Sequence, residues 1–239
     1  MRLFICLIFG LSFTPVFGSE VRLAVASNFA NPIKELIREF EKNSDIKIKL
    51  SLGSTGKQYA QILQGAPFDL FLSADSLRPK LLEEKGIGVR STRSTYAVGK
   101  LVLWTPKIRT SSELLKDLKN INFKYISIAK PKLAPYGKLA KNYLRELGIW
   151  KKLNNKMVQG QNINQAMQFV LSGNAQLGLL AYSQVKNLKG SLIKLDDRYK
   201  IAQQVILLKE STSNRKFLSF LKSNQAKKII QDLGYEVRP

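Results

Sequence analysis

The chain has 239 residues and a formal net charge of +22, because 39 lysine and arginine residues outnumber 17 aspartate and glutamate residues. It contains no histidine and one cysteine, which excludes a Ser-His-Asp triad, a Cys-His dyad and a histidine-ligated metal. Hydrophobic residues make up 44% of the chain, enough for a folded core and too many for a disordered basic protein. We therefore expect a folded, soluble and very basic protein.

Residues 1–18 have the pattern of a secretory signal peptide. Arg2 supplies a positive start, residues 3–13 are almost unbroken apolar sequence, and Gly18 is a small residue at the expected cleavage point. The apolar stretch is shorter than the ~20 residues that a membrane span needs; a retained N-terminal anchor is the alternative. Cys6 lies inside this stretch and not at the cleavage point, so we expect no lipid attachment. We predict cleavage after Gly18, which leaves an exported protein without cysteine.

The exported part of the chain begins with three strand-helix units. A strand at 21–26 precedes a helix whose first turn carries Pro32. Apolar and polar residues alternate at 46–52, which predicts a second strand, and the glycine-rich turn 53–56 leads into the next helix. A third strand is expected at 68–73, again followed by a helix. Three such units in succession favour a mostly parallel sheet with right-handed crossovers.

A second α/β series follows a longer predicted strand at 96–104. Its members are helices at 112–118, 137–147 and 163–171, strands at 125–129, 177–181 and 201–208, and closing helices at 214–221 and 225–233. No low-complexity linker separates the two series. We therefore predict an α/β protein with two lobes, with residues 19–98 and 203–239 in lobe 1 and residues 99–202 in lobe 2. Ligands of such sheets bind beyond the carboxyl ends of strands, so the cleft between the lobes is the expected site.

Four turns between a strand and the helix after it offer uncharged hydrogen-bond donors. They are Ala26-Ser27-Asn28, Gly53-Ser54-Thr55-Gly56-Lys57, Ala134-Pro135-Tyr136-Gly137 and Gly160-Gln161-Asn162-Ile163. The free N–H groups and the positive dipole end of a helix start favour an anion. Helix capping or turn chemistry explains each turn taken alone, whereas four at equivalent places favour one shared anion pocket. The second turn is not a P-loop, because Ser51 stands where that motif needs glycine.

The first three of these turns, together with two further segments, resemble the periplasmic molybdate-binding proteins of ABC importers. The further segments are Gly65-Ala66-Pro67-Phe68-Asp69-Leu70-Phe71-Leu72-Ser73-Ala74-Asp75 and Gly173-Asn174-Ala175-Gln176-Leu177-Gly178. The resemblance covers residues 20–239. It implies a type II periplasmic binding-protein fold that closes about a hinge near Gly99 and residues 200–205. It also implies a monomeric, non-enzymatic carrier without cofactor, which binds molybdate or tungstate in the periplasm and delivers it to an inner-membrane permease.

The resemblance assigns five residues of this chain to the ligand. Ser27 and Thr55 would donate hydroxyl and backbone hydrogen bonds, and Asn28 would add its backbone N–H from lobe 1. Tyr136 and Ile163 match positions that contribute backbone N–H groups from lobe 2. Some relatives place a tyrosine beyond the Leu-Gly pair. Here the aligned position is Ala181 with Tyr182 beside it, and Tyr182 is left out of the predicted site.

A site made only of donors suits the chemistry of molybdate. This tetrahedral dianion is fully deprotonated near neutral pH, so it accepts hydrogen bonds and donates none, whereas a carboxylate in the site would favour a protonated oxyanion. Sulfate has shorter bonds to oxygen, and each hydrogen bond that it leaves unmade costs about 1 to 3 kcal/mol. We expect Asp69 and Asp75 to cap helices. For Lys57, a solvated side chain is the alternative to contact with the anion.

The large positive charge permits a second interpretation. A basic protein of this kind can bind nucleic acid or another polyanion. The lysines are nevertheless scattered over amphipathic elements rather than gathered with aromatic residues, and export argues against a nucleic-acid partner. The alternatives to a molybdate carrier are therefore a binding protein for another oxyanion, such as sulfate, and a basic secreted protein that binds polyanions.

Overall fold

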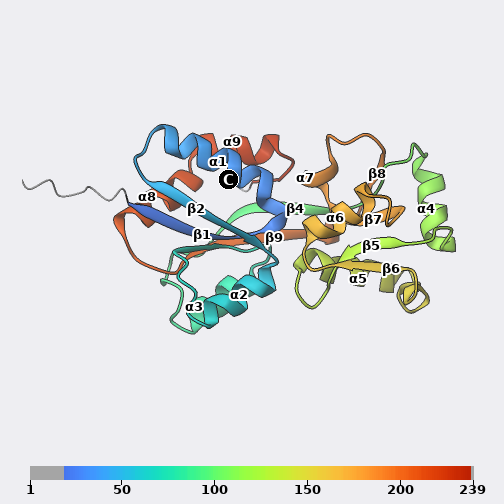
Figure 1. The fold of residues 1–239 in the computed structure, drawn as a ribbon, viewed down its shortest axis with the longest axis horizontal. Coiled ribbons are helices and arrows are strands. Elements are labelled where there is room, and N and C mark those ends of the chain that lie inside the picture. The colour runs from blue at the N-terminus through green and yellow to red at the C-terminus, as the bar shows by residue number, and fades with distance from the viewer. Residues whose placement is uncertain (1–18, 238–239) are drawn as a thin grey trace, which may run out of the picture.

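The computed structural model describes residues 19–237, so the predicted signal peptide lies outside the described residues (Figure 1). The strands are β1 (Glu20–Ala26), β2 (Lys47–Gly53), β3 (Leu70–Leu72), β4 (Ser94–Thr105), β5 (Ile126–Ala129), β6 (Met157–Gly160), β7 (Leu177–Ala181), β8 (Ser191–Lys194) and β9 (Lys200–Leu207). They pair in the order β2-β1-β3-β9-β4-β7-β5-β6, and β8 pairs with β4. Every strand predicted from the sequence is present. The strands β6 and β8 were not predicted, because each has four residues and no clear alternation.

The helices also follow the predicted order. They are α1 (Ala30–Lys42), α2 (Thr55–Leu63), α3 (Leu77–Glu84), α4 (Ser111–Asn120), α5 (Pro135–Glu146), α6 (Ile163–Leu171), α7 (Tyr182–Val185), α8 (Thr212–Leu221) and α9 (Asn224–Asp232), with 3-10 turns η1 (Ser27–Phe29), η2 (Trp150–Leu153) and η3 (Asp197–Tyr199). Only the short α7 and the 3-10 turns were not predicted. Among residues 19–237, no helix combines the length and the apolar character needed to cross a membrane.

The sheet is mixed, which corrects the prediction of a mostly parallel sheet. β1 is parallel to β2 and β3, and β5 is parallel to β6 and β7. In the middle, β9 runs antiparallel to β3 and β4, and β4 runs antiparallel to β7 and β8. The strand-helix-strand units are therefore parallel as predicted. The strand direction reverses at β4 and β9, which connect these units.

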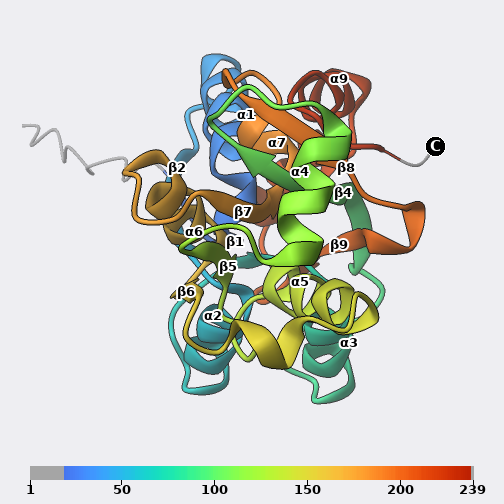
Figure 2. The same cartoon turned by 90° about the vertical axis from the view of Figure 1, so that its right-hand side faces the viewer.

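The crossing strands β4 and β9 join two lobes (Figure 1). Lobe 1 contains β1 to β3 with α1 to α3, α8 and α9, and lobe 2 contains β5 to β8 with α4 to α7. The predicted boundaries, after residues 98 and 202, fall within the two crossing strands and stay a prediction. Figure 2 looks at the molecule from the lobe 2 end, with α4 in front.

Both faces of the lobe 1 sheet are covered by helices, as the alternation of side chains along β1 requires. Val21, Leu23 and Val25 lie on one face in a core that includes residues of α1, α8 and α9. Ala24 lies on the opposite face, in a smaller core with residues of α2 and α3. Lobe 2 has one large core around β4, β5 and β7.

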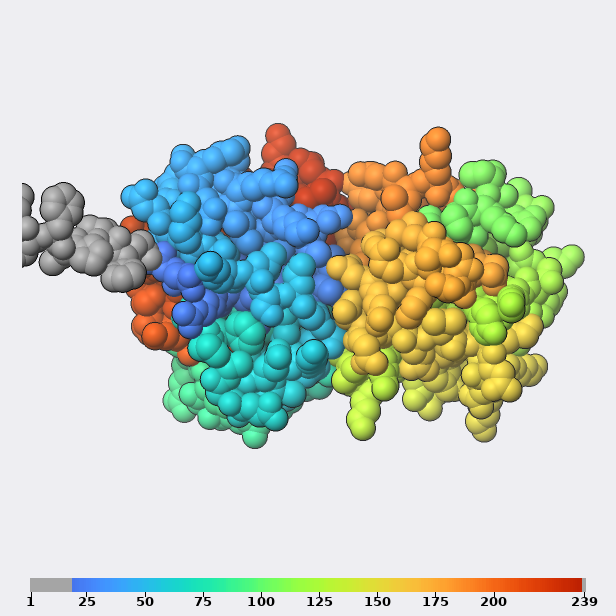
Figure 3. Space-filling view, viewed as in Figure 1, coloured from blue at the N-terminus to red at the C-terminus, as the bar shows by residue number. Residues whose placement is uncertain are grey.

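The two lobes are in direct contact (Figure 3). The backbone N–H of Gly56 in lobe 1 donates to the Leu133 carbonyl of lobe 2 at 2.9 Å. A Cβ at position 56 would lie 2.8 Å from that carbonyl oxygen, so glycine permits this close approach. Ala26 is the last residue of β1, and Ala74 lies shortly after β3. Both come from lobe 1, yet both belong to the core of lobe 2.

Residues 235–237 return to the crossing strands. Glu236 pairs with Val98 of β4 through two backbone hydrogen bonds, of 2.7 and 3.0 Å. Its carboxylate lies 2.6 Å from Lys100 Nζ of β4 and 3.0 Å from Lys200 Nζ of β9. The hydrogen bond from Lys100, followed by that from Lys200, lowers the pKa of Glu236. One carboxylate therefore ties both crossing strands to this segment.

We predict that Glu236→Gln lowers the free energy of unfolding by about 1 kcal/mol at neutral pH, since the pair is partly exposed and screened by solvent. Because the folded-state pKa is lowered, the contribution is present above the unfolded pKa and is lost as the pH falls through the folded value. Urea unfolding at several pH values measures this. The difference in the free energy of unfolding between Glu236→Gln and wild type should vanish in acid. A difference that persists there would contradict the stabilising role of the Glu236 carboxylate.

Candidate anion-binding site

The first predicted turn forms η1, which leads from β1 directly into α1. Ser27 and Asn28 are polar, yet each is only 4% exposed. The side-chain amide of Asn28 donates to Gln203 Oε1 at 2.8 Å and to Tyr235 Oη at 2.9 Å. The first N–H groups of a helix have no acceptor within it, so the Asn28 N–H stays available. Among residues 19–237, no group forms a hydrogen bond with the Ser27 hydroxyl.

The second turn divides capping and ligand donation between two residues. Ser54 caps α2, because its Oγ accepts from Lys57 N at 3.4 Å. Thr55 is 1% exposed, and its Oγ1 accepts from Ala74 N at 3.1 Å. That bond occupies a lone pair of the hydroxyl oxygen, so the hydroxyl proton of Thr55 is left to donate.

The third turn opens α5 with Pro135 at the first helical position, where the proline needs no N–H. Tyr136 follows and is buried, and its backbone N–H is one of the unpaired groups of the first turn. Gly137 allows the turn to press on the end of β5, since a Cβ there would lie 2.1 Å from the Ala129 carbonyl oxygen. The Pro-Tyr-Gly sequence thus brings the backbone N–H of Tyr136 close to the end of β5.

The fourth turn places Ile163 at the start of α6, as predicted. Asn162 caps the helix through Oδ1, which accepts from Gln165 N at 3.0 Å. The cap satisfies the third N–H of the helix and leaves that of Ile163 free. Gly160 ends β6 beneath this turn, and a Cβ there would lie 2.4 Å from Ala166 N.

The structure brings these turns together from both lobes. The turn η1 packs against α6, and Gln203 bonds to the side chains of both Asn28 and Tyr136. The backbone N–H of Gly56, which follows Thr55, donates to the carbonyl of Leu133, the residue before Ala134. Outside the helices, no backbone hydrogen bond within residues 19–237 uses the N–H of Asn28, Thr55, Tyr136 or Ile163, so these N–H groups stay available to a ligand. Several neutral donors from two lobes form an arrangement that can hold an oxyanion.

Three buried phenols lie behind the turns and carry no charge at neutral pH. Burial raises the pKa of Tyr235 to about 12 and holds those of Tyr96 and Tyr136 well above their usual value. The sequence analysis did not single out Tyr96, Tyr235 or Gln203 as part of the site. Their partners are far away along the chain, and the only local signal is a pair of glutamines within an apolar strand.

Two aspartates of the distinctive segment have structural roles. Asp75 accepts from Arg78 N at 3.0 Å and forms an ion pair with the same arginine, which confirms its capping role. Asp69 instead accepts from Arg22 N of β1 at 2.7 Å. The prediction that Asp69 caps a helix is therefore wrong, because the residue stands before a strand and binds the neighbouring one.

Lys57 and Tyr182 were the other two candidates. The Lys57 side chain is exposed and lines a groove of about 320 Å³ between α2 and the turns before α5 and α6. The Tyr182 ring lies beneath Lys194 Nζ, at 4.9 Å from the ring centre. A cavity of about 610 Å³ at the outer end of lobe 1 contains none of the four turns. In the part of the chain that the structure describes, no cluster of three acidic, cysteine or histidine residues can hold a metal ion.

Known proteins are similar to this chain in sequence and architecture. The molybdate-binding protein ModA of Azotobacter vinelandii is 41% identical, over 98% of this chain and 96% of its own length. Its counterpart in Rhodobacter capsulatus is 40% identical, over 97% and 93%. A solved structure of the Azotobacter vinelandii periplasmic molybdate-binding protein superposes with a TM-score of 0.86 at 31% identity, and the match covers 92% of this chain and all of that one.

The structural match confirms the predicted two-lobed α/β binding-protein fold. Residues 21–236 also match the family model described as bacterial extracellular solute-binding protein. Proteins of this class bind solutes without transforming them. The fold, the cleft between two lobes and the matched sequence agree, and the chain belongs to the bacterial extracellular solute-binding proteins.

Proposed function

We propose that this protein captures molybdate, and also tungstate, in the periplasm and delivers it to an ABC permease of the inner membrane. Cleavage after Gly18 would release the mature protein. It would act as a monomer and would have no nucleic-acid partner. Ser27, Asn28, Thr55, Tyr136 and Ile163 are the proposed ligands. Lobe 1 would comprise residues 19–98 and 203–239, and lobe 2 residues 99–202. The names of the two relatives that are about 40% identical support the choice of ligand.

The observation that carries the proposal is the set of buried, neutral and unused donors. The Thr55 hydroxyl already accepts one bond and has its proton left, and the helix starts at Tyr136 and Ile163 present N–H groups without acceptors. A dianion that accepts from every side matches such a site, whereas a protonated oxyanion is favoured by a carboxylate acceptor, which none of these five residues carries.

Thermal unfolding in the presence of oxyanions tests the function. A ligand that binds only the folded protein stabilises it, by about 2.7 kcal/mol when its concentration is 100 times Kd. We expect molybdate and tungstate to raise Tm, with sulfate and hydrogen phosphate giving much smaller shifts at equal concentration. A larger shift with sulfate would favour a sulfate carrier. No shift with any of them would reject the proposal.

Single hydroxyl deletions should weaken binding without unfolding the protein. Ser27→Ala and Thr55→Ala each remove one hydrogen bond to a charged ligand, worth about 1.5 to 3 kcal/mol, so Kd should rise roughly 10- to 150-fold. Ser54→Ala is the matched control, because Ser54 caps the same helix as Thr55 and should lower stability with little effect on affinity. Isothermal titration measures all three. Equal loss in the control would show that the effect is structural.

Closure should depend on the glycine at the contact between the lobes. In Gly56→Ala the new Cβ meets the Leu133 carbonyl, while the helical backbone of α2 accepts alanine well. We expect an unchanged or higher Tm without ligand, weaker molybdate binding, and a larger radius of gyration with molybdate by small-angle X-ray scattering. Gln61→Ala, on the same helix and in the same groove, is the control. Full closure of Gly56→Ala around molybdate would contradict this role of Gly56.

The positive charge should speed capture of a dianion. Between Asp117 and Glu146 the chain has seven basic residues and no acidic one, and this stretch contains the turn at 134–137. Steering by such a field weakens when salt shortens the Debye length. In stopped-flow measurements the association rate should therefore fall as ionic strength rises from about 0.01 to 0.15 M, with less change in dissociation. A rate that is insensitive to salt would reject steering.

A further inference from the structure

Gln203 links the two halves of the site through a single side-chain amide. It lies on the crossing strand β9 and is completely buried. Its Oε1 accepts from Asn28 Nδ2 at 2.8 Å and from Tyr96 Oη at 3.2 Å. Its Nε2 donates to Tyr136 Oη at 3.2 Å. The amide is thus bonded to residues from the first and third anion-binding turns and to the other crossing strand.

The Asn28 side chain is held from a second direction as well. Tyr235 accepts from Asn28 Nδ2 at 2.9 Å and donates to the Asn28 carbonyl at 2.7 Å. Ser183 of lobe 2 donates to the same phenol at 2.9 Å. The side-chain Nδ2 and the carbonyl of Asn28 are therefore both held, while its backbone N–H stays available.

Tyr136 is fixed by space as well as by its hydrogen bond. A Cβ at position 99 on β4 would lie 1.9 Å from Tyr136 Oη and 2.6 Å from Gln203 Nε2. The phenol therefore occupies space that only glycine leaves, beside the two crossing strands. Since Tyr136 belongs to the first turn of α5, anchoring its ring sets the direction of the free N–H groups there.

We propose that Gln203 is a positioning residue of the anion site, which aligns the Asn28 and Tyr136 turns without contacting the anion. This inference rests on the proposed function and adds a residue that acts from behind the ligands. A neutral amide accepts from Asn28 through its oxygen and donates to Tyr136 through its nitrogen at the same time. It does so without bringing a negative charge near a bound dianion.

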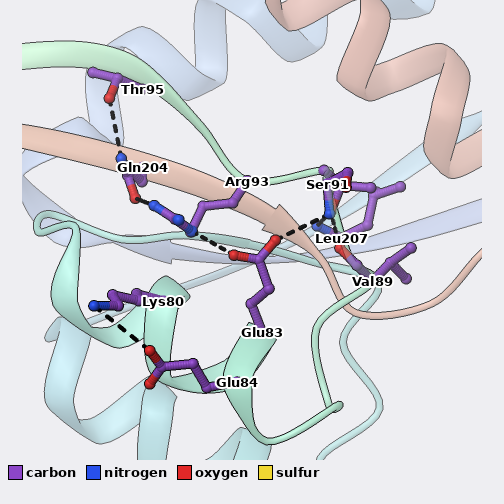
Figure 4. A network of polar contacts seen from close by, with 10 residues as sticks. Lys80, Glu83, Glu84, Val89, Ser91, Arg93, Thr95, Gln204 and Leu207 are labelled. Atoms are coloured by element: carbon purple, nitrogen blue, oxygen red, sulfur yellow. Dashed lines mark hydrogen bonds and ion pairs between the residues drawn. The ribbon is translucent and has the colours of Figure 1, made fainter.

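The adjacent Gln204 provides a matched control. It points to the other face of β9, where it donates to Thr95 Oγ1 at 3.3 Å and accepts from Arg93 Nη1 at 2.9 Å (Figure 4). Arg93 in turn bonds to Glu83 of α3. Gln204→Leu therefore removes a comparable set of hydrogen bonds from the same strand, on the side away from the anion-binding turns.

The first measurement compares molybdate affinity at neutral pH. We expect Gln203→Leu to raise Kd roughly 10- to 100-fold and Gln204→Leu to change it less than about twofold, while both lower Tm. Gln203→Glu gives a further readout. A protonated glutamic acid accepts and donates like the amide, whereas its carboxylate does not, so binding should approach wild type at pH 5 and weaken above pH 7. The titratable groups facing this position are Tyr96 and Tyr136, with Tyr235 beyond Asn28, and all three stay neutral in this range.

Hydrogen exchange in the absence of ligand separates this inference from the proposed function. Gln203→Leu should speed amide exchange in peptides covering residues 26–30 and 134–139, relative to Gln204→Leu. A wild-type protein that ignores molybdate would reject the proposed function, and the exchange result would still decide whether Gln203 positions the turns. Unchanged exchange, or equal affinity losses in the two leucine variants, would overturn the proposal.

Discussion

The site depends on backbone N–H groups that begin helices and therefore have no acceptor within their own helix. Local sequence keeps these groups available. Pro135 occupies a position that needs no N–H, and the cap from Asn162 satisfies a later N–H while leaving that of Ile163 free. Glycines let the turns press on the strand ends beneath them, as Gly137 does on Ala129. The architecture around the cleft thus serves to present unpaired donors in a buried place.

Charge is divided between the surface and the cleft. The chain carries a formal net charge of +22, yet the groups that line and support the anion-binding turns are hydroxyls, amides and phenols. Burial keeps the phenols protonated, and the nearby carboxylate of Asp75 is occupied by Arg78. Long-range attraction and short-range recognition are therefore assigned to different residues, and a change to one need not alter the other.

The sequence predicted every long element, because apolar spacing and turn residues act locally. The helix at 163–171, for example, is found with those bounds. It also predicted the residues of the four turns. It did not predict Gln203 or Tyr235, because their bonds reach Asn28 across 175 and 207 positions of the chain. The role of Asp69 was assigned wrongly for the same reason, since its partner Arg22 lies on a strand formed much earlier in the chain.

The bond between Tyr235 and Asn28 joins segments that are 207 positions apart in the chain. Tyr235 and Glu236 follow β9 and α9 in the chain, yet the phenol restrains Asn28 and the next residue's carboxylate clamps Lys100 and Lys200. The last segment that the structure describes therefore contributes to the site from behind, by holding both Asn28 and the two crossing strands in place.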